Sequence, residues 1–156
     1  MASQTELKAL TMLRSIQLTH DMETRHLRKL ASMAQEVQFE KDELIYRRGD
    51  RGRAVYLIQE GEVVIEMIAA GHGRIVLNTL QAGQFFGWSS LFPFERKMAW
   101  TRATKPTQAL AFDAGQLLQA CRTDHGFEYA LTRRAGRDLT ERITAARRQL
   151  SGSEVV

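Results

Sequence analysis

The sequence is poor in the residues that mark several classes of protein. Its 156 residues include one cysteine, Cys121, and two prolines. A lone thiol cannot form an internal disulfide, and a zinc or iron–sulfur site of four cysteines is equally excluded. No apolar run approaches the roughly 20 residues of a membrane-spanning helix, and the N-terminus lacks the apolar segment of a signal peptide. We therefore expect a protein of the cytoplasm that does not enter a membrane.

The common catalytic fingerprints are also missing. The sequence contains no Gly-x-Ser-x-Gly, no P-loop, no His-Glu-x-x-His and no dinucleotide-binding glycine motif. Its four histidines are scattered along the chain, so no metal-ligating set stands out. We therefore expect a non-enzymatic protein without a bound metal.

Arginine is in excess near the end of the chain. The net charge is +4, and residues 133–148 carry six arginines against Asp138 and Glu141. Such a cluster can attract phosphates or acidic partners, although it is more often a solvated helix face.

Apolar spacing divides the chain into three parts. Residues 4–34 have the three-to-four-residue period of two short helices. Residues 37–112 contain seven short apolar or alternating runs separated by turn residues, which is typical of a β-barrel or sandwich. Residues 113–150 return to helical spacing. The length suits one domain, which we expect to cover residues 1–150.

The last part predicts two helices. Asp113 and Asp124 are suited to cap them, and the second helix is expected to run to about Leu150. Apolar residues recur along it every three or four positions. The apolar face that they form is expected to pack against either the β-barrel or another helix. The residues expected to contact a second copy of the chain are Leu131, Ala135, Leu139 and Ile143. A flexible tail is expected at 151–156.

The most specific pattern runs from Gly49 to Gly61. Gly49 and Gly52 precede the apolar run 54–58, and Gly61 follows it. Glycines at these points allow the tight turns of a β-hairpin. The spacing resembles the first signature of the cyclic nucleotide-binding domain family, the effector module of catabolite activator proteins. The resemblance covers most of the chain and implies a mainly β fold with flanking α: a double-stranded β-helix or jelly-roll-like β-roll with N-terminal helices and a long C-terminal helix.

The second signature of that family, its phosphate-binding cassette, resembles residues 86–103, with a variable loop at 92–96. The candidate ligand-binding residues are Phe86, Gly87, Trp88, Ser89, Ser90, Arg96, Lys97 and Ala99. The resemblance places Trp88 where the family has a glutamate that accepts the ribose 2′-hydroxyl, and Lys97 where an arginine contacts the cyclic phosphate. Tryptophan cannot accept a hydrogen bond, and lysine lacks the forked geometry of arginine. Either the pocket is filled by Trp88, or it is adapted to another ligand with Trp88 as a stacking surface.

These features together predict a regulatory or interaction domain with a degenerate cassette that does not bind cyclic AMP in the family's usual way. It would act through its last helix, by homodimerisation or by docking on a protein partner. The alternative is a genuine sensor of cyclic AMP, cyclic GMP or another small anion with a non-standard pocket, and no further cofactor is expected. Relatives of the activator type carry a helix-turn-helix after the long helix. Six residues beyond Leu150 cannot form one, so sequence-specific DNA binding is not expected.

Overall fold

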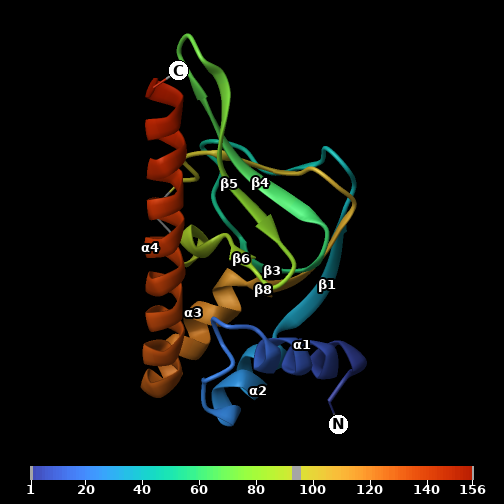
Figure 1. The fold of residues 1–156 in the computed structure, drawn as a ribbon. Helices are drawn as coiled ribbons and strands as arrows, with labels where there is room; N and C mark the ends of the chain where they lie inside the picture. The colour runs from blue at the N-terminus through green and yellow to red at the C-terminus, as the bar shows by residue number, and fades with distance from the viewer. Residues whose placement is uncertain (1, 93–95, 156) are drawn as a thin grey trace.

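The computed structural model describes residues 2–92 and 96–155, and its helices and strands follow the predicted order (Figure 1). Two helices, α1 (Gln4–Ser15) and α2 (Thr24–Ser32), come first. The second helix ends earlier than the predicted boundary at residue 34, because Ala34 already pairs with Phe112 in a sheet. The strands are β1 (Ala34–Phe39), β2 (Leu44–Tyr46), β3 (Ala54–Glu60), β4 (Glu62–Ala69), β5 (Gly73–Gln81), β6 (Phe85–Phe86), β7 (Trp100–Ala103) and β8 (Thr107–Asp113).

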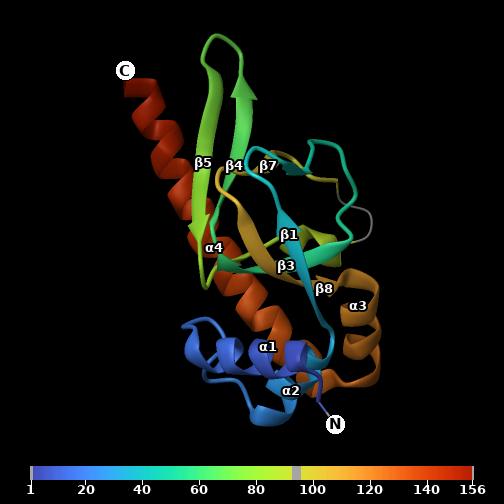
Figure 2. The ribbon, with the colours of Figure 1, turned by 90° about the vertical axis from the view of Figure 1, so that its right-hand side faces the viewer.

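The strands form two four-stranded antiparallel sheets. Their orders are β1-β8-β3-β6 and β2-β7-β4-β5, so strands far apart in the sequence lie side by side (Figure 2). The β4–β5 hairpin is the longest pairing and extends past the body of the sheets. This arrangement confirms the predicted β-roll with flanking helices.

Two apolar clusters hold these layers together. The smaller one joins the two sheets, with Ile58, Val63 and Phe86 each no more than 1 % exposed. The larger one lies between the first sheet and the helices and includes Leu13 and Leu110. Because β3 faces both clusters, its apolar residues form a nearly continuous buried run rather than an alternating one.

The chain returns from β8 into α3 (Ala114–Thr123) and α4 (His125–Val155). Both predicted caps are present. The Asp113 carboxylate accepts a hydrogen bond from the amide three residues on, at 3.0 Å. The Asp124 carboxylate accepts from the amide of Phe127 at 3.1 Å. Each cap satisfies an amide that the helix itself leaves unpaired.

The long helix α4 has two differently placed halves. In its first half Phe127, Leu131 and Ala135 are buried in the larger core cluster. Leu131 and Ala135 are therefore not available to a second copy, which corrects the prediction that they form a dimer contact. Gly136 follows, exposed and with no atom within 4 Å of the position of a Cβ. The second half of α4 then runs along β5 (Figure 1).

Helix α4 extends into the segment 151–156, whose flexibility stays a prediction. The helix continues five residues beyond Leu150, and Val156 lies outside the described residues. Extending an existing helix adds one hydrogen bond for each residue fixed, so weak helix formers can follow an established one.

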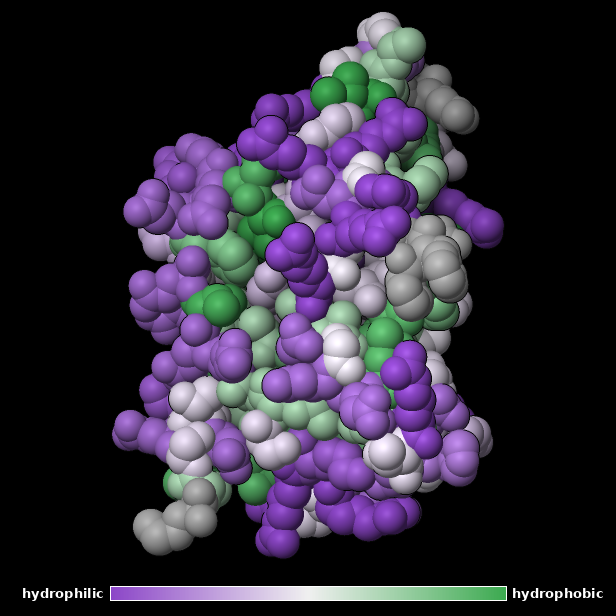
Figure 3. Space-filling view, turned by 180° about the vertical axis from the view of Figure 1, so that it is seen from behind, coloured by the Kyte–Doolittle hydropathy of each residue, from purple (hydrophilic) through white to green (hydrophobic). Residues whose placement is uncertain are grey.

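The surface turned away from the viewer in Figure 1 is mostly hydrophilic, with apolar side chains in small groups (Figure 3). Among the described residues, no helix combines the length and the apolar composition needed to cross a bilayer.

Candidate functional site

The predicted cassette begins with a left-handed turn at Gly87. Its φ is +91°, and it is followed by a short 3₁₀ helix, η1 (Trp88–Leu91). A Cβ at Gly87 would lie 2.8 Å from the carbonyl oxygen of Ala54 in β3, so a side chain is excluded by space as well as by conformation. The Ser90 hydroxyl donates to the same carbonyl at 2.9 Å and fixes η1 against β3.

Lys97, from the later part of the cassette, packs its side chain against η1. Its backbone amide donates to the carbonyl of Asp50 at 2.8 Å, and its carbonyl accepts from the amide of Gly49 at 2.8 Å. Its ammonium donates to the hydroxyls of Ser89 at 2.7 Å and Ser90 at 3.3 Å. The Nζ atom also lies 4.1 Å from the ring centroid of Tyr46, close enough for a cation–π contact.

The ammonium of Lys97 is buried without a compensating negative charge nearby. The residue is 8 % exposed, and the described residues place no carboxylate within 4 Å of its Nζ. Burial lowers the pKa of Lys97 to about 8, because loss of hydration disfavours the charged form. A negative charge next to the ammonium would favour its charged form.

Gly52 allows the preceding loop to close over this lysine. A Cβ at Gly52 would lie 2.9 Å from Cε of Lys97 and closer still to the hydroxyl of Ser90. The sequence pattern identified this glycine as a turn residue. Its packing role against the cassette could not be seen before the two segments were placed together.

Trp88 connects the cassette to α4. It is 3 % exposed, and its ring centroid lies 5.2 Å from that of Phe85. Its indole Nε1 donates to Oδ2 of Asp138 in α4 at 2.6 Å. The indole is therefore buried, and almost none of its surface is open to stack on a ligand. Of the two alternatives for Trp88, this placement favours the pocket-filling residue.

Asp138 is shared between Trp88 and a second donor on α4. The Arg142 guanidinium donates from Nη2 to both carboxylate oxygens, at 3.1 and 3.2 Å. Burial raises the pKa of Asp138, while the Arg142 charge and the Trp88 hydrogen bond act in the opposite direction. Burial also lowers the pKa of Arg142. The carboxylate accepts three short contacts, which leaves it little capacity to bind a ligand hydroxyl.

A cleft of about 410 Å³ lies between the cassette and the second half of α4. Its wall residues are Tyr46, Ile65, Leu77, Asn78, Gly87, Trp88, Ser89, Arg96, Lys97, Met98, Ala99, Thr101, Leu139, Arg142, Ile143 and Ala146. Two predicted site residues are not among them. Phe86 points into the core between the sheets, stacked on Tyr56 at 5.0 Å, because it alternates with its neighbours along β6. Ser90 is not a wall residue but contacts three of them: its hydroxyl accepts from Lys97 at 3.3 Å and lies 3.4 Å from the Tyr46 hydroxyl, and its amide donates to the carbonyl of Gly87 at 2.9 Å.

Several wall residues were not predicted as ligand contacts. Leu77 and Asn78 come from β5, and the Asn78 amide donates to the carbonyl of Arg142 at 3.2 Å. Leu139 and Ile143 were noticed as part of the apolar spacing of the last helix, but spacing alone does not distinguish a cleft wall from a contact with another chain. Their positions identify α4 as one side of the candidate site.

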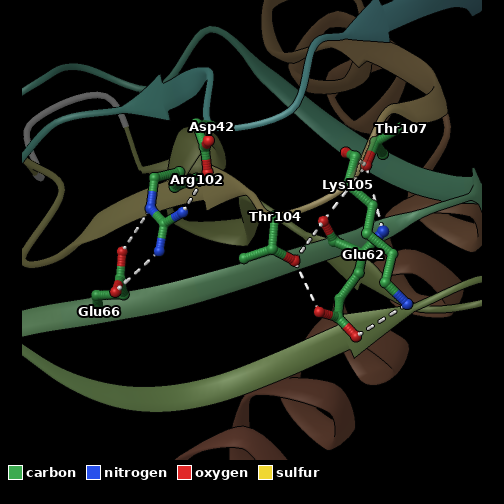
Figure 4. A network of polar contacts seen from close by, with 7 residues as sticks. All are labelled: Asp42, Glu62, Glu66, Arg102, Thr104, Lys105 and Thr107. Carbon is green, nitrogen blue, oxygen red and sulfur yellow. Dashed lines mark hydrogen bonds and ion pairs between the residues drawn. The ribbon is translucent and has the colours of Figure 1, made fainter.

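Arg102 is near the cassette in sequence but is not among the wall residues of the cleft. Figure 4 shows its contacts with Asp42 and Glu66. Its guanidinium donates from Nε and Nη2 to the Glu66 carboxylate at 3.0 and 3.3 Å, and from Nη1 to Asp42 at 3.0 Å. A second group in the same view joins Thr104 to Glu62, with 2.7 Å between hydroxyl and carboxylate. These contacts cross-link β7 to β4 and the β2 loop. Among the described residues of the cleft wall, Lys97 is the buried cation without an ion pair.

Comparisons with known proteins agree with this geometry. The family model of the cyclic nucleotide-binding domain matches residues 36–124. A putative potassium channel protein of Rhodopseudomonas palustris is 32 % identical over 88 residues, which cover 56 % of this chain and 21 % of the channel. The cAMP-activated global transcriptional regulator Vfr of Pseudomonas aeruginosa is 25 % identical over 140 residues, covering 86 % of this chain and 63 % of the regulator. The chain thus matches less than two thirds of either relative.

Solved structures share the fold. A cyclic nucleotide-binding domain from Methylobacillus flagellatus superimposes with a TM-score of 0.80 at 22 % identity, over 95 % of this chain and 83 % of that one. The catabolite activator protein of Thermus thermophilus gives a TM-score of 0.67 at 26 % identity, over 80 % and 58 %. The family model matches more than half of the sequence, and the β-roll and cassette turn are in place. The chain belongs to the cyclic nucleotide-binding domain family.

Proposed function

We propose that this domain is a regulatory module in which occupancy of the cleft controls the position of α4. The observation that carries this proposal is that the cassette and α4 line the same cleft. The cassette forms one wall and α4 the other, and the hydrogen bond from Trp88 to Asp138 joins them. A ligand between the two walls would contact the helix directly. Any difference in affinity between two helix positions would then shift their populations.

Trp88 and Lys97 argue for weak rather than tight binding of cyclic AMP. At the position of the family's ribose-binding glutamate, the Trp88 indole is a donor and is already paired with Asp138. Lys97 supplies one ammonium in place of a forked guanidinium. An unpaired ribose hydroxyl costs about 1–3 kcal/mol, and 1.4 kcal/mol corresponds to tenfold in affinity. We therefore expect a dissociation constant of about 100 μM or weaker, two decades above an ordinary micromolar site.

A genuine cyclic nucleotide sensor is the second candidate. Lys97, Ser89 and the turn at Gly87 retain a place for one phosphate charge. A relative named as a cAMP-activated regulator matches most of the chain. This candidate needs Trp88 to leave its buried position, or the ribose to bind without a carboxylate.

The proposed action is binding and not catalysis, and we place it in the cytoplasm. The relatives reported above are named as a channel and a transcriptional regulator. The one thiol, Cys121, is buried, and burial together with nearby acidic groups raises its pKa, so it is poorly suited to act as a nucleophile.

The output of the module would be docking of α4 on a second copy or on a protein partner. Of the four residues predicted for a dimer contact, Ile143 remains substantially exposed, at 52 %. Replacing Ile143 with Asp should convert a dimer into a folded monomer, measured by light scattering. The neighbouring exposed Thr144, changed to Asp, is the matched control. A native protein that is monomeric at high micromolar concentration would contradict the dimer.

Calorimetric titration with cyclic AMP tests the ligand, and amide hydrogen exchange tests the coupling. We expect weak 1:1 binding that Lys97→Met abolishes, while Lys105→Met, an exposed lysine outside the cleft, has no effect. At 10 mM cyclic AMP, exchange in residues 138–146 should slow. Submicromolar binding of cyclic AMP would refute the expectation that Trp88 and Lys97 weaken its affinity. Binding without any change in α4 exchange would refute the coupling.

A further inference from the structure

The wall of the cleft has an excess of positive charge. Its described residues include three cations, Arg96, Lys97 and Arg142, and no carboxylate. Arg142 is already paired with Asp138. Arg96 is exposed to solvent and donates to the carbonyl of Gly49 at 3.2 Å. Lys97 is therefore the buried cation available to an occupant.

One ammonium matches one negative charge. A phosphate monoester carries nearly two charges at neutral pH, and the second would lose hydration without gaining a partner. A carboxylate or a cyclic phosphate carries one. The charge of the site thus selects a monoanion, and the rest of the wall must distinguish between these two.

The rest of the wall is mainly apolar. Seven of its residues carry aliphatic side chains or a thioether: Ile65, Leu77, Met98, Ala99, Leu139, Ile143 and Ala146. All seven are partly or largely exposed in this structure, so an apolar occupant would remove their surfaces from water. These residues come from β4, β5, the cassette and α4, and they face one another across the cleft.

Three polar side chains in or beside the wall already have hydrogen-bond partners within the protein. The Asn78 amide donates to the carbonyl of Arg142, and the Ser89 hydroxyl accepts from Lys97. The Asp138 carboxylate accepts from Trp88 and Arg142. Ribose hydroxyls and base edges placed against the aliphatic wall would lose hydrogen bonds to water without replacement.

The size of the cleft also indicates an organic ligand. About 410 Å³ lies within the range of about 300–1,000 Å³ that is typical of small-molecule sites, which are mostly apolar with a few placed polar groups. We propose that the occupant is an amphipathic organic monoanion, of the class of medium-chain carboxylates, with its carboxylate on Lys97 and its apolar body between β5 and α4. This inference rests on the proposed regulatory function and names the ligand class of the same site.

Calorimetric titrations with octanoate, octan-1-ol and cyclic AMP test the proposal. Octanoate should bind 1:1 and at least tenfold more tightly than either of the others. Lys97→Met should lower its affinity at least tenfold, whereas Lys105→Met should change it less than twofold. The affinity should also fall as the pH rises through about 8, because Lys97 then loses the charge that the carboxylate needs.

A second variant keeps the test decisive if Lys97→Met does not fold. Leu77→Asp places a negative charge in the wall and should lower octanoate affinity at least tenfold. Thr79→Asp, on an exposed position of the same strand outside the cleft, is its control. Equal octanoate affinity in the native protein and in Lys97→Met or Leu77→Asp would overturn the proposal. Tighter binding of cyclic AMP than of octanoate would overturn it while leaving the regulatory function standing. Binding of none of the three probes would overturn both.

Discussion

Replacing Trp88 with Phe should destabilise the protein because it removes a buried hydrogen bond to a carboxylate. The indole Nε1 lies 2.6 Å from Oδ2 of Asp138, and Trp88 is 3 % exposed. A hydrogen bond to a charged group contributes about 1.5–3 kcal/mol, and the lost ring atoms add about 1 kcal/mol. The free energy of unfolding should fall by about 2–4 kcal/mol. For a chain of this length, that lowers Tm by about 4–16 °C.

A double-mutant cycle separates the hydrogen bond from the lost packing. Trp88→Phe and Asp138→Ala are measured singly and together by urea denaturation, followed by far-UV circular dichroism. Asp138→Ala leaves Arg142 without its carboxylate in both backgrounds, so that cost cancels in the cycle. The remaining coupling energy should be about 1.5–3 kcal/mol.

Trp100 provides the control for this cycle. It is half-buried beside Glu66 and Ile68, in a shallow groove outside the cleft. Trp100→Phe should show no coupling with Asp138. A coupling energy for Trp88 below about 0.5 kcal/mol, equal to that of the control within ordinary additivity error, would refute the link between the cassette and α4.

Three further measurements test other parts of the structure. Gly52→Ala should lower the free energy of unfolding by about 1–3 kcal/mol, and with it the urea midpoint, because its Cβ would collide with Ser90 and Lys97. An unchanged urea midpoint would mean that the loop has room to move. Gly136→Ala should raise the unfolding free energy by about 0.5–1 kcal/mol, since it improves helix propensity and its Cβ meets no atom within 4 Å. The pKa of Lys97 is lowered from 10.5 to about 8, so the unfolded chain binds more protons between these values. The unfolding free energy should therefore rise over this pH range in the native protein, and Lys97→Met should remove that component of the rise.

Most of the fold could be predicted because its elements have local signals. Apolar spacing located α1, the caps at Asp113 and Asp124 located α3 and α4, and turn residues, several of them glycines, separated seven of the strands. The strand β6 was missed because its two residues are too few to show a period. The end of α4 was placed early because the sequence around residue 151 has weak helix formers and no clear stop.

The candidate site was harder to predict because its two walls are far apart in sequence. Strand alternation puts Lys97, Ala99 and Thr101 on one face, yet Arg96 and Met98, which alternation would put on the other face, also line the cleft. Alternation could not show that residue 88 meets residue 138, since no spacing rule links positions fifty residues apart. Phe86 was assigned to the site by its place in a motif, although in the structure it alternates away into the core.

The division of α4 at Gly136 means that a small bend at this residue would displace the far end of the helix more than the cleft wall. Its first half is clamped in the core, whereas its second half forms the cleft wall and extends to the end of the element. Residue 150 lies fourteen positions beyond residue 136, or roughly 21 Å along the helix, so a bend of about 10° at the glycine would move it by about 4 Å. The wall residues lie closer to the pivot than the tip does. If the proposed function holds, a displacement of the wall by about one methyl group would become a larger movement at residue 150, which a docked partner could detect.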